Sequence, residues 1–273
     1  MPPPALLFDL DNTLLMEDQA TFSSVHRACE LAHDRAGVEA EALHASVLRI
    51  APEVWRAAPI YAYAEEMGMW WGEGLWGEFR GDAPGLRSLR AFVPGFRREV
   101  WRGALAAAAA PDEALATELE AAYVTARRAR QPVDTEAERV LDDLGRDHRL
   151  ALVTNGAPDV QREKLAGTTL APRFAAIVIS AELGIAKPDP RIFDHALRAI
   201  GAEREGAVVI GDSLTRDVAG ARGAGLRSIW IDRGGESPRP DDAVPDARVT
   251  ALSQIRSHLA APAPDVASLR GSP

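Results

Sequence analysis

The chain has little cysteine, little lysine and no long apolar run. One cysteine, Cys29, occurs among 273 residues, which excludes a disulfide framework or a cysteine-built zinc site within the chain. No apolar stretch approaches the roughly 18 residues that a membrane helix needs, and the first residues lack the basic region and apolar length of a signal peptide. We therefore expect a soluble, cytoplasmic protein in which Cys29 is a small buried side chain.

Positive charge is also scarce. The sequence has 40 acidic and 31 basic side chains, so its formal net charge is −9. This balance argues against nucleic acid or an anionic membrane as a partner, because both attract clustered positive charge. Only two basic residues are lysines, Lys164 and Lys187, and the rest are arginines. Because an ammonium is a compact charge and a guanidinium a planar fork, a position that keeps lysine in such a chain is of interest.

Five short apolar runs are typical of parallel strands that are buried on both faces, because they show no alternation and are followed by polar residues. The runs are Ala5–Phe8, Leu150–Val153, Ala175–Ile179, Ala207–Ile210 and Ser228–Ile231. Amphipathic segments of helical length lie between the later runs: Pro158–Ala166, Pro190–Ile200 and Thr215–Gly223. This alternation predicts an α/β fold whose core is a Rossmann-like, doubly wound parallel sheet.

The segment between the first two runs breaks this alternation. It contains no convincing strand, and helical periodicity is clear over Phe22–Ala36, Glu41–Ile50 and Asp112–Arg130. We therefore predict an all-helical domain inserted into the core. The expected division is 1–16 and 132–261 for the core, 17–131 for the insertion and 262–273 for a proline-rich, disordered tail.

Most of the tryptophans fall in this insertion: Trp55, Trp70, Trp71, Trp76 and Trp101. They can form the core of the insertion, line an apolar pocket over a site, or make a contact between two copies of the chain. A monomer and a homodimer are both compatible with the sequence. Glycines predict a loop over residues 69–85, and a mobile loop there could close over a substrate.

Polar side chains follow the predicted strands where each strand ends. Those of the first, second and fourth runs, with the loop after the third, are Asp9, Asp11, Thr13, Thr154, Asn155, Lys187, Asp212, Ser213 and Asp217. Ligands bind beyond the carboxyl ends of strands in such sheets. Clustered carboxylates without nearby histidine or cysteine suit Mg²⁺, and a lysine, a hydroxyl and helix-start N–H groups suit phosphate. The residues thus predict a Mg²⁺-dependent site for a phosphorylated compound.

Four motifs that contain these residues resemble those of the haloacid dehalogenase (HAD) superfamily of phosphohydrolases. They are Phe8-Asp-Leu-Asp-Asn-Thr-Leu14, Val153-Thr-Asn-Gly156, Lys187-Pro-Asp-Pro190 and Gly211-Asp-Ser-Leu-Thr-Arg-Asp217. The insertion resembles the C1 cap of that family, and residues 178–193 are similar to pyrimidine 5′-nucleotidases and N-acylneuraminate-9-phosphatases. The resemblance implies a phosphoric monoester hydrolase that acts on a small phosphomonoester.

The resemblance also implies a role for each site residue. Asp9 would be the nucleophile that forms an aspartyl-phosphate, and Asp11 would protonate the leaving oxygen and then activate water. Thr154, Asn155 and Lys187 would bind the phosphoryl group.

The metal implied by the resemblance is Mg²⁺. Its ligands would be the Asp9 carboxylate, the Asp11 carbonyl and Asp212, with Asp217 as a further ligand or a support through water. A sugar phosphomutase and a non-catalytic sensor of a phosphorylated ligand are the alternatives. The second lysine, Lys164, is expected on the exposed face of the Pro158–Ala166 helix.

Overall fold

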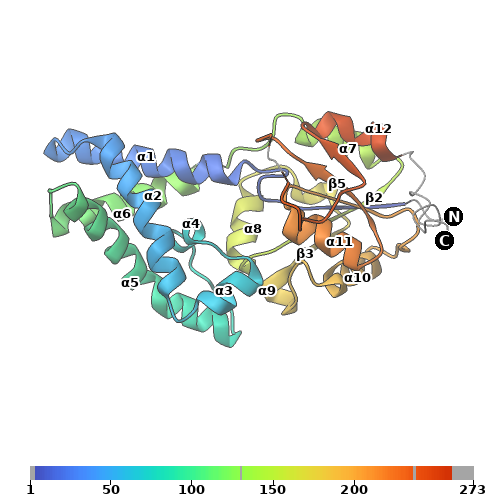
Figure 1. Ribbon diagram of the computed structural model, residues 1–273, viewed down its shortest axis with the longest axis horizontal. Helices are drawn as coiled ribbons and strands as arrows, with labels where there is room; N and C mark the ends of the chain where they lie inside the picture. Colours follow the sequence, from blue (N-terminus) through green and yellow to red (C-terminus); the bar gives the residue numbers. More distant parts are fainter. Residues whose placement is uncertain (1–3, 130, 236–237, 260–273) are drawn as a thin grey trace.

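The computed structural model describes residues 4–129, 131–235 and 238–259, and its core is one parallel sheet (Figure 1). The six strands lie in the order β3-β2-β1-β4-β5-β6. Their bounds are β1 (Ala5–Phe8), β2 (Arg149–Thr154), β3 (Ala176–Ile179), β4 (Val208–Gly211), β5 (Arg227–Ile231) and β6 (Ala247–Val249). The predicted Rossmann-like fold class is confirmed. The strand that the sequence analysis missed, β6, is three residues long and only its last residue is buried.

Both faces of the sheet are buried, which explains the unbroken apolar runs. Leu6 of β1 pairs with Leu150 of β2 and Val208 of β4, and these three side chains share one face. Leu7 lies on the opposite face with its neighbours Ala151 and Val209. Because successive residues of a strand point to opposite faces, a strand covered on both sides has to be apolar throughout.

Helices cover the two faces of this sheet. One face packs against α7 (Ala137–Leu144) and α12 (Ile255–Leu259), and the other against α10 (Pro190–Ala199) and α11 (Ala219–Gly223). Two further helices, α8 (Pro158–Ala166) and α9 (Ser180–Leu183), follow β2 and β3 on the side of the insertion (Figure 1). Short turns of 3₁₀ helix at 171–173 and 252–254, and a π-helical turn at 214–218, complete the core.

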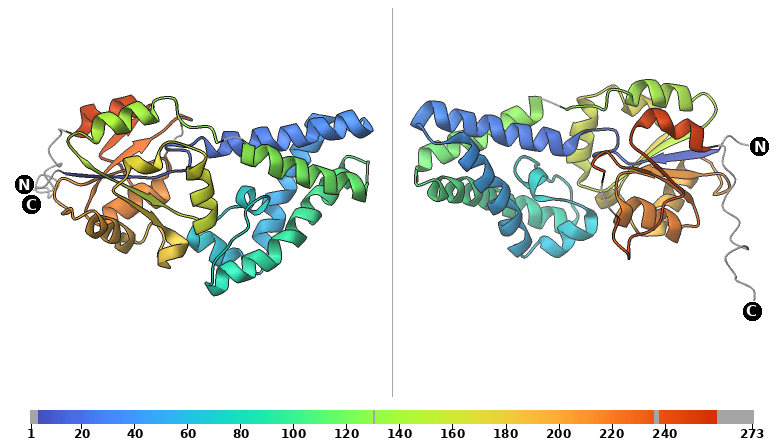
Figure 2. Two further views of the ribbon diagram at one scale, coloured as in Figure 1. Left: turned by 180° about the vertical axis from the view of Figure 1, so that it is seen from behind. Right: turned by 45° about the horizontal axis from the view of Figure 1, so that its top comes forward.

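Six helices lie between β1 and α7, beside the sheet rather than on its faces (Figure 2), and we call them the cap. They are α1 (Glu17–Ala36), α2 (Ala40–Ala57), α3 (Tyr61–Met67), α4 (Trp71–Gly74), α5 (Pro84–Ala107) and α6 (Glu113–Ala129). Two of the predicted helical segments lie in α1 and α2, and α6 covers residues 113–129 of the third. The predicted loop over 69–85 contains the four-residue α4, and α5 was missed because its sequence includes two prolines and three glycines.

The helices of the cap pack around a hydrophobic core, which also includes Val160 of α8 and Ala181 of α9. Trp55, Trp76 and Trp101 are buried in it, as is Cys29. Burial raises the pKa of the Cys29 thiol to about 12, so this cysteine is an inert apolar side chain. The first of the three explanations for the tryptophans therefore applies to these three residues.

The disordered tail predicted for 262–273 lies outside the described residues. Within the residues that the structure describes, no helix is long and apolar enough to cross a membrane.

Candidate active site

The carboxyl ends of β1, β2 and β4 border a cavity of about 180 Å³ between the sheet and the cap. The residues to which a catalytic, phosphate-binding or metal-binding role was assigned line this cavity, namely Asp9, Asp11, Thr154, Asn155, Lys187, Asp212 and Asp217, whereas Thr13 is buried outside its lining. The cap contributes Gly68, Trp70 and Glu73 to its wall, so one tryptophan of the cap does face the site.

Lys187 is buried between two of the carboxylates. Its Nζ donates hydrogen bonds to Asp9 Oδ1 at 2.5 Å and to Asp217 Oδ1 at 2.7 Å. Burial disfavours the ammonium, but the carboxylates of Asp217 and Asp9 outweigh this effect and raise the pKa of Lys187. The Asn155 side chain holds the lysine backbone by a hydrogen bond from Nδ2 to Lys187 O (3.0 Å) and one from Lys187 N to Oδ1 (2.9 Å). Asn155 therefore positions the ammonium between its partners.

Three carboxylates are crowded at the same place. One oxygen each of Asp9, Asp212 and Asp217 lies within 4.8 Å of the others. Burial raises the pKa of Asp9 to about 7, with a further increase from the charges of Asp217 and Asp11 and an opposing effect of Lys187. Burial also raises the pKa of Asp212 well above its ordinary value. One ammonium does not balance these charges, and an all-oxygen donor set fits a hard divalent cation such as Mg²⁺.

Local structure fixes the two carboxylates that follow β4. Gly211 has no side chain at a point where a Cβ would lie 2.3 Å from Asp217 Cγ, so a larger residue would displace this carboxylate. Ser213 N donates to Asp217 Oδ2 at 3.1 Å. Trp230 of β5 donates from Nε1 to the backbone oxygen of Asp212 at 2.7 Å. The loop after β4 thus presents both carboxylates to the cavity.

The second lysine corrects an expectation. Lys164 is not on an exposed face of α8; its side chain is fully buried, and Nζ donates to Asp11 Oδ1 and Oδ2 at 3.0 and 2.9 Å. The cap covers the side of α8 that would otherwise face water. On the same helix, Gln161 Nε2 donates to Asp11 Oδ2 at 2.9 Å and to Thr154 Oγ1 at 3.1 Å. The scarcity of lysine was the available signal, and it applied to Lys164 as much as to Lys187.

The cap supplies three more charged residues that the sequence analysis missed. Glu73 Oε1 accepts from Lys164 Nζ at 2.8 Å, and Glu17 Oε2 lies 3.4 Å from the same atom. Arg127 is completely buried and forms an ion pair with Glu17. Burial raises the pKa of Glu73 to about 7, although Lys164 opposes this. The site therefore continues into a buried charge cluster, formed by Asp11, Glu17, Glu73, Arg127 and Lys164.

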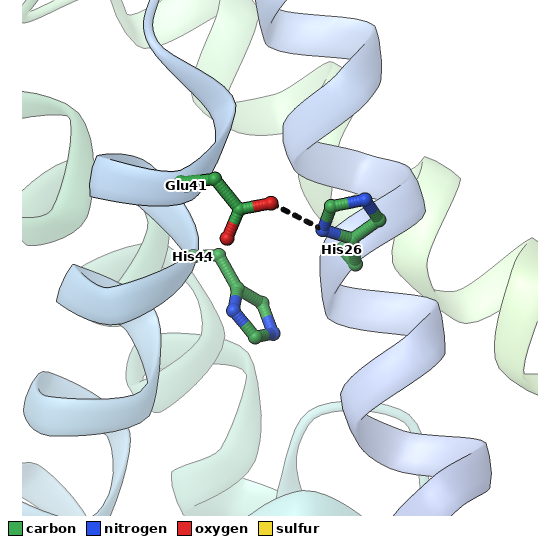
Figure 3. A group of neighbouring side chains, drawn as sticks. All are labelled: His26, Glu41 and His44. Atoms are coloured by element: carbon green, nitrogen blue, oxygen red, sulfur yellow. Dashed lines mark ion pairs between the residues drawn. The ribbon is translucent and has the colours of Figure 1, made fainter.

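A second group of titratable side chains lies within the cap (Figure 3). His26 comes from α1, and Glu41 and His44 come from α2, with His26 Nδ1 3.7 Å from Glu41 Oε1. The two imidazole rings meet edge to face with their centroids 5.7 Å apart, and the Glu41 side chain is 74% exposed. One nitrogen or oxygen atom each of His26, Glu41 and His44 lies within 4.8 Å of the others. We assign this group to packing of α1 against α2.

Comparisons with known proteins show the family of the chain. The profile of haloacid dehalogenase-like hydrolases matches residues 3–225. A phosphoserine phosphatase of Thermus thermophilus is 43% identical over 255 residues, which are 92% of this chain and 96% of that protein. An N-acylneuraminate-9-phosphatase of Rattus norvegicus is 30% identical over 151 residues, which are 55% of this chain and 61% of that protein.

A solved structure shows the same fold. The putative HAD-hydrolase YfnB of Bacillus subtilis, bound to magnesium, aligns with a TM-score of 0.64 over 96% of this chain and 100% of that chain, at 22% identity. The expectation of a phosphatase-type hydrolase with a Rossmann-like core and a helical cap is confirmed. The chain belongs to the haloacid dehalogenase-like hydrolase family.

Proposed function

We propose that the protein is a Mg²⁺-dependent phosphatase that transfers the phosphoryl group of a small phosphomonoester first to Asp9 and then to water. The observation that carries this proposal is the position of Lys187 Nζ between Asp9 and Asp217, at a cavity that Asp212 and Thr154 also line. A carboxylate nucleophile, a cation-binding acidic group and anion-binding groups thus meet at one place, as phosphoryl transfer requires.

Each of these side chains has a defined role in the proposed reaction. Asp9 attacks phosphorus while the ester P–O bond breaks, and Asp11 gives its proton to the departing alcohol oxygen. Asp11 next takes a proton from the water that hydrolyses the aspartyl-phosphate, which returns Asp9 and releases inorganic phosphate. Lys187 and the Thr154 hydroxyl stabilise the charge on the phosphoryl oxygens. The four motifs imply these roles, and the residues that would perform them line one cavity.

The residues that would hold Mg²⁺ are Asp9, Asp212 and Asp217 through their carboxylates and Asp11 through its backbone carbonyl. The bound ion supplies positive charge that offsets the charge of the phosphoryl group during transfer. Its expected effect on the protein is to keep the crowded carboxylates ionised.

The substrate that we propose first is phosphoserine. The similarity to a phosphoserine phosphatase extends over almost the full length of both chains. The cavity of about 180 Å³ also favours a small alcohol, since pockets for drug-sized ligands have about 300–1,000 Å³. A nucleotide or a nine-carbon sugar phosphate would need a wider opening between the cap and the core.

The test is phosphate release from phosphoserine, N-acylneuraminate 9-phosphate and a pyrimidine nucleotide, each with and without Mg²⁺. We expect phosphoserine to be hydrolysed only with Mg²⁺, and Asp9→Asn to lose activity by more than about 1,000-fold. The matched control is Asp142→Asn, a change of the same kind at an exposed carboxylate that pairs with Arg173, and it should keep full activity. Activity of Asp9→Asn, or release of phosphate without a divalent cation, would contradict the proposal. A phosphomutase would move the phosphoryl group to a sugar, and a sensor would retain the ligand unchanged.

A further inference from the structure

The ammonium of Lys164 lies in an interior position that is costly for a charge. The side chain is 0% exposed, and an unpaired charge at such a site would be strongly destabilising. Three carboxylates surround Nζ: Asp11 at 2.9 and 3.0 Å, Glu73 at 2.8 Å and Glu17 at 3.4 Å. The position is therefore built around a cation, and one of its partners is the proposed acid and base of the reaction.

The contact with Asp11 fixes the orientation of that carboxylate. Lys164 Nζ is within hydrogen-bond distance of both carboxylate oxygens, and Gln161 Nε2 adds a third donor at 2.9 Å to Oδ2. Gln161 and Lys164 are three residues apart on α8, so they project from the same face of one helix. A carboxylate that accepts hydrogen bonds from two side chains of one helix cannot rotate freely. Proton transfer at a defined oxygen needs such a fixed orientation.

The other partners of Lys164 belong to the cap. Glu73 comes from α4, at the wall of the cavity. Glu17 is the first residue of α1, and its ion-pair partner Arg127 lies near the end of α6. Lys164 thus connects Asp11 to the segments where the chain enters and leaves the cap, and to the part of the cap that faces the substrate.

We propose that Lys164 is the positioning residue of Asp11 and that it couples the orientation of the Asp11 carboxylate to the position of the Glu73 side chain. The inference rests on the proposed function, because it assigns a role relative to Asp11 as acid and base. Lys164 takes no proton and does not touch the substrate. Its contribution is to hold the Asp11 carboxylate where the leaving oxygen and later the attacking water meet it.

Kinetics with two phosphate esters distinguish the positioning role of Lys164 from a purely structural role. An alkyl phosphate, such as phosphoserine, needs a proton on its departing oxygen, whereas p-nitrophenolate departs from p-nitrophenyl phosphate without one. The ratio kcat/KM covers the steps up to transfer to Asp9, so it depends on Asp11 only for the alkyl ester. Hydrolysis of the aspartyl-phosphate needs Asp11 as a base whichever ester supplied the phosphoryl group, and this step enters kcat.

We expect Lys164→Met to lower kcat/KM by about 100-fold for the alkyl ester and by less than about threefold for p-nitrophenyl phosphate. With p-nitrophenyl phosphate, kcat and KM should fall together. The control is Arg162→Met, which removes a cation from the exposed side of the same helix, where it pairs with Glu182, and it should change neither ester's kinetics. Equal losses of kcat/KM for the two esters, or no loss, would overturn the proposal.

The link to the cap has its own pair of variants. Glu73→Gln keeps an oxygen that accepts from Lys164, and Glu73→Leu removes it. We expect Glu73→Leu to lower kcat/KM for the alkyl ester by about 10-fold, as for the loss of one hydrogen bond to a charged group, and Glu73→Gln to cause a clearly smaller loss. The same kinetics in both variants would overturn this link.

Two controls keep the outcome decisive. Thermal unfolding shows whether Lys164→Met is folded. If it is not, Lys164→Arg replaces it, because arginine keeps the charge but shifts the donor atoms. The same contrast between the two esters in Lys164→Arg would support the proposal, and equal losses would overturn it. A wild-type protein that hydrolyses neither ester with Mg²⁺ would overturn the proposed function together with this inference. An active wild type without the contrast would overturn only the inference.

Discussion

At the residue scale, the two lysines have the same environment. Lys187 and Lys164 are both buried, and each donates to carboxylates from different segments of the chain. In a chain whose other basic residues are arginines, these two positions have kept the compact cation. The physical reason at Lys187 is the small space between Asp9 Oδ1 and Asp217 Oδ1, which one nitrogen fills.

The conservative change Lys187→Arg is therefore expected to be damaging. A guanidinium fork cannot take the place of one nitrogen without moving Asp9 or Asp217, so we expect kcat to fall by about 100-fold while the protein stays folded. Steady-state kinetics and circular dichroism measure the two effects. The reverse change at an exposed site, Arg191→Lys, should leave kcat unchanged, since Arg191 pairs with Asp189 at the surface. A Lys187→Arg variant with wild-type kcat would exclude this account.

Glu73 gives a pH dependence of stability. Burial raises its pKa from the ordinary 4.5 to about 7, so the folded state favours the protonated form. The resulting stabilisation is full below pH 4.5 and is lost as the pH rises through 7. Glu73→Gln does not titrate, so the thermal midpoint of the wild type should fall relative to that of Glu73→Gln between pH 5 and pH 8, without divalent cations. Parallel curves for the two proteins would refute the prediction, and Glu182→Gln, an exposed change, serves as the control.

At the scale of elements, the segment after α3 joins the cap to the core at close range. Gly68 has φ +76°, and a Cβ there would lie 2.5 Å from Asn155 Cβ. Ser180 Oγ donates to the neighbouring Met67 O at 2.8 Å, and Arg216 Nη2 donates to Glu65 O at 2.9 Å. Asn155 in turn holds the backbone of Lys187. A side chain added at Gly68 would therefore displace Asn155 and, through it, the ammonium of Lys187.

Gly68→Ala should therefore affect both stability and catalysis. The positive φ alone costs about 1 kcal/mol for a residue with a Cβ, and the contact with Asn155 adds to this. We expect a lower thermal midpoint and a kcat/KM reduced by about 10-fold or more, since small shifts of catalytic groups are costly.

The matched control for this prediction is Gly37→Ala. Gly37 also has a positive φ (+65°), but among the described residues no atom lies within 4 Å of the position that its Cβ would take. It should lose a similar amount of stability through strain and none of its activity. If both variants kept full activity, the contact between Gly68 and Asn155 would have no role at the site.

Local sequence patterns predicted those helices and strands whose surroundings are the same along their whole length. The strands β1, β2, β4 and β5 are buried almost throughout, and β3 is buried over its last two residues, so their apolar runs were visible in the sequence. β6 lies at the edge of the sheet and is partly exposed, and α5 contains Pro84 and Pro94, so neither has the expected pattern. The limits of the cap at 17–131 stay a prediction.

The site was predictable to the extent that strand ends define it. The seven residues to which a role was assigned follow strands or belong to motifs, and they line one cavity. The contacts of Lys164 with Asp11 and Glu73 join positions 153 and 91 residues apart. No local pattern encodes such pairs, because they depend on how the segment after β1, the cap and α8 pack against one another.

At the scale of the whole molecule, metal binding should couple to stability. The crowded carboxylates of Asp9, Asp212 and Asp217 repel one another, and a divalent cation removes this repulsion. We expect saturating Mg²⁺ to raise the thermal midpoint by about 5 °C. The rise should be larger at pH 8 than at pH 6, because protons compete with the metal for Asp9, whose pKa is about 7.

Thermal unfolding with and without Mg²⁺ at the two pH values measures this coupling. Asp212→Asn should abolish the stabilisation, and Asp142→Asn should preserve it. A midpoint that does not respond to Mg²⁺, or one that responds equally at both pH values, would show that the acidic group does not bind the ion in the expected way.

The enclosure of both lysines has a consequence for chemical labelling. Every side-chain primary amine of this protein is inside the folded molecule, beside the centre where we place the reaction. Acylating or methylating reagents that modify surface amines in most proteins should therefore leave Lys164 and Lys187 untouched until the cap moves away from the core. The extent of modification at these two positions, read by mass spectrometry, would report directly how often the molecule opens.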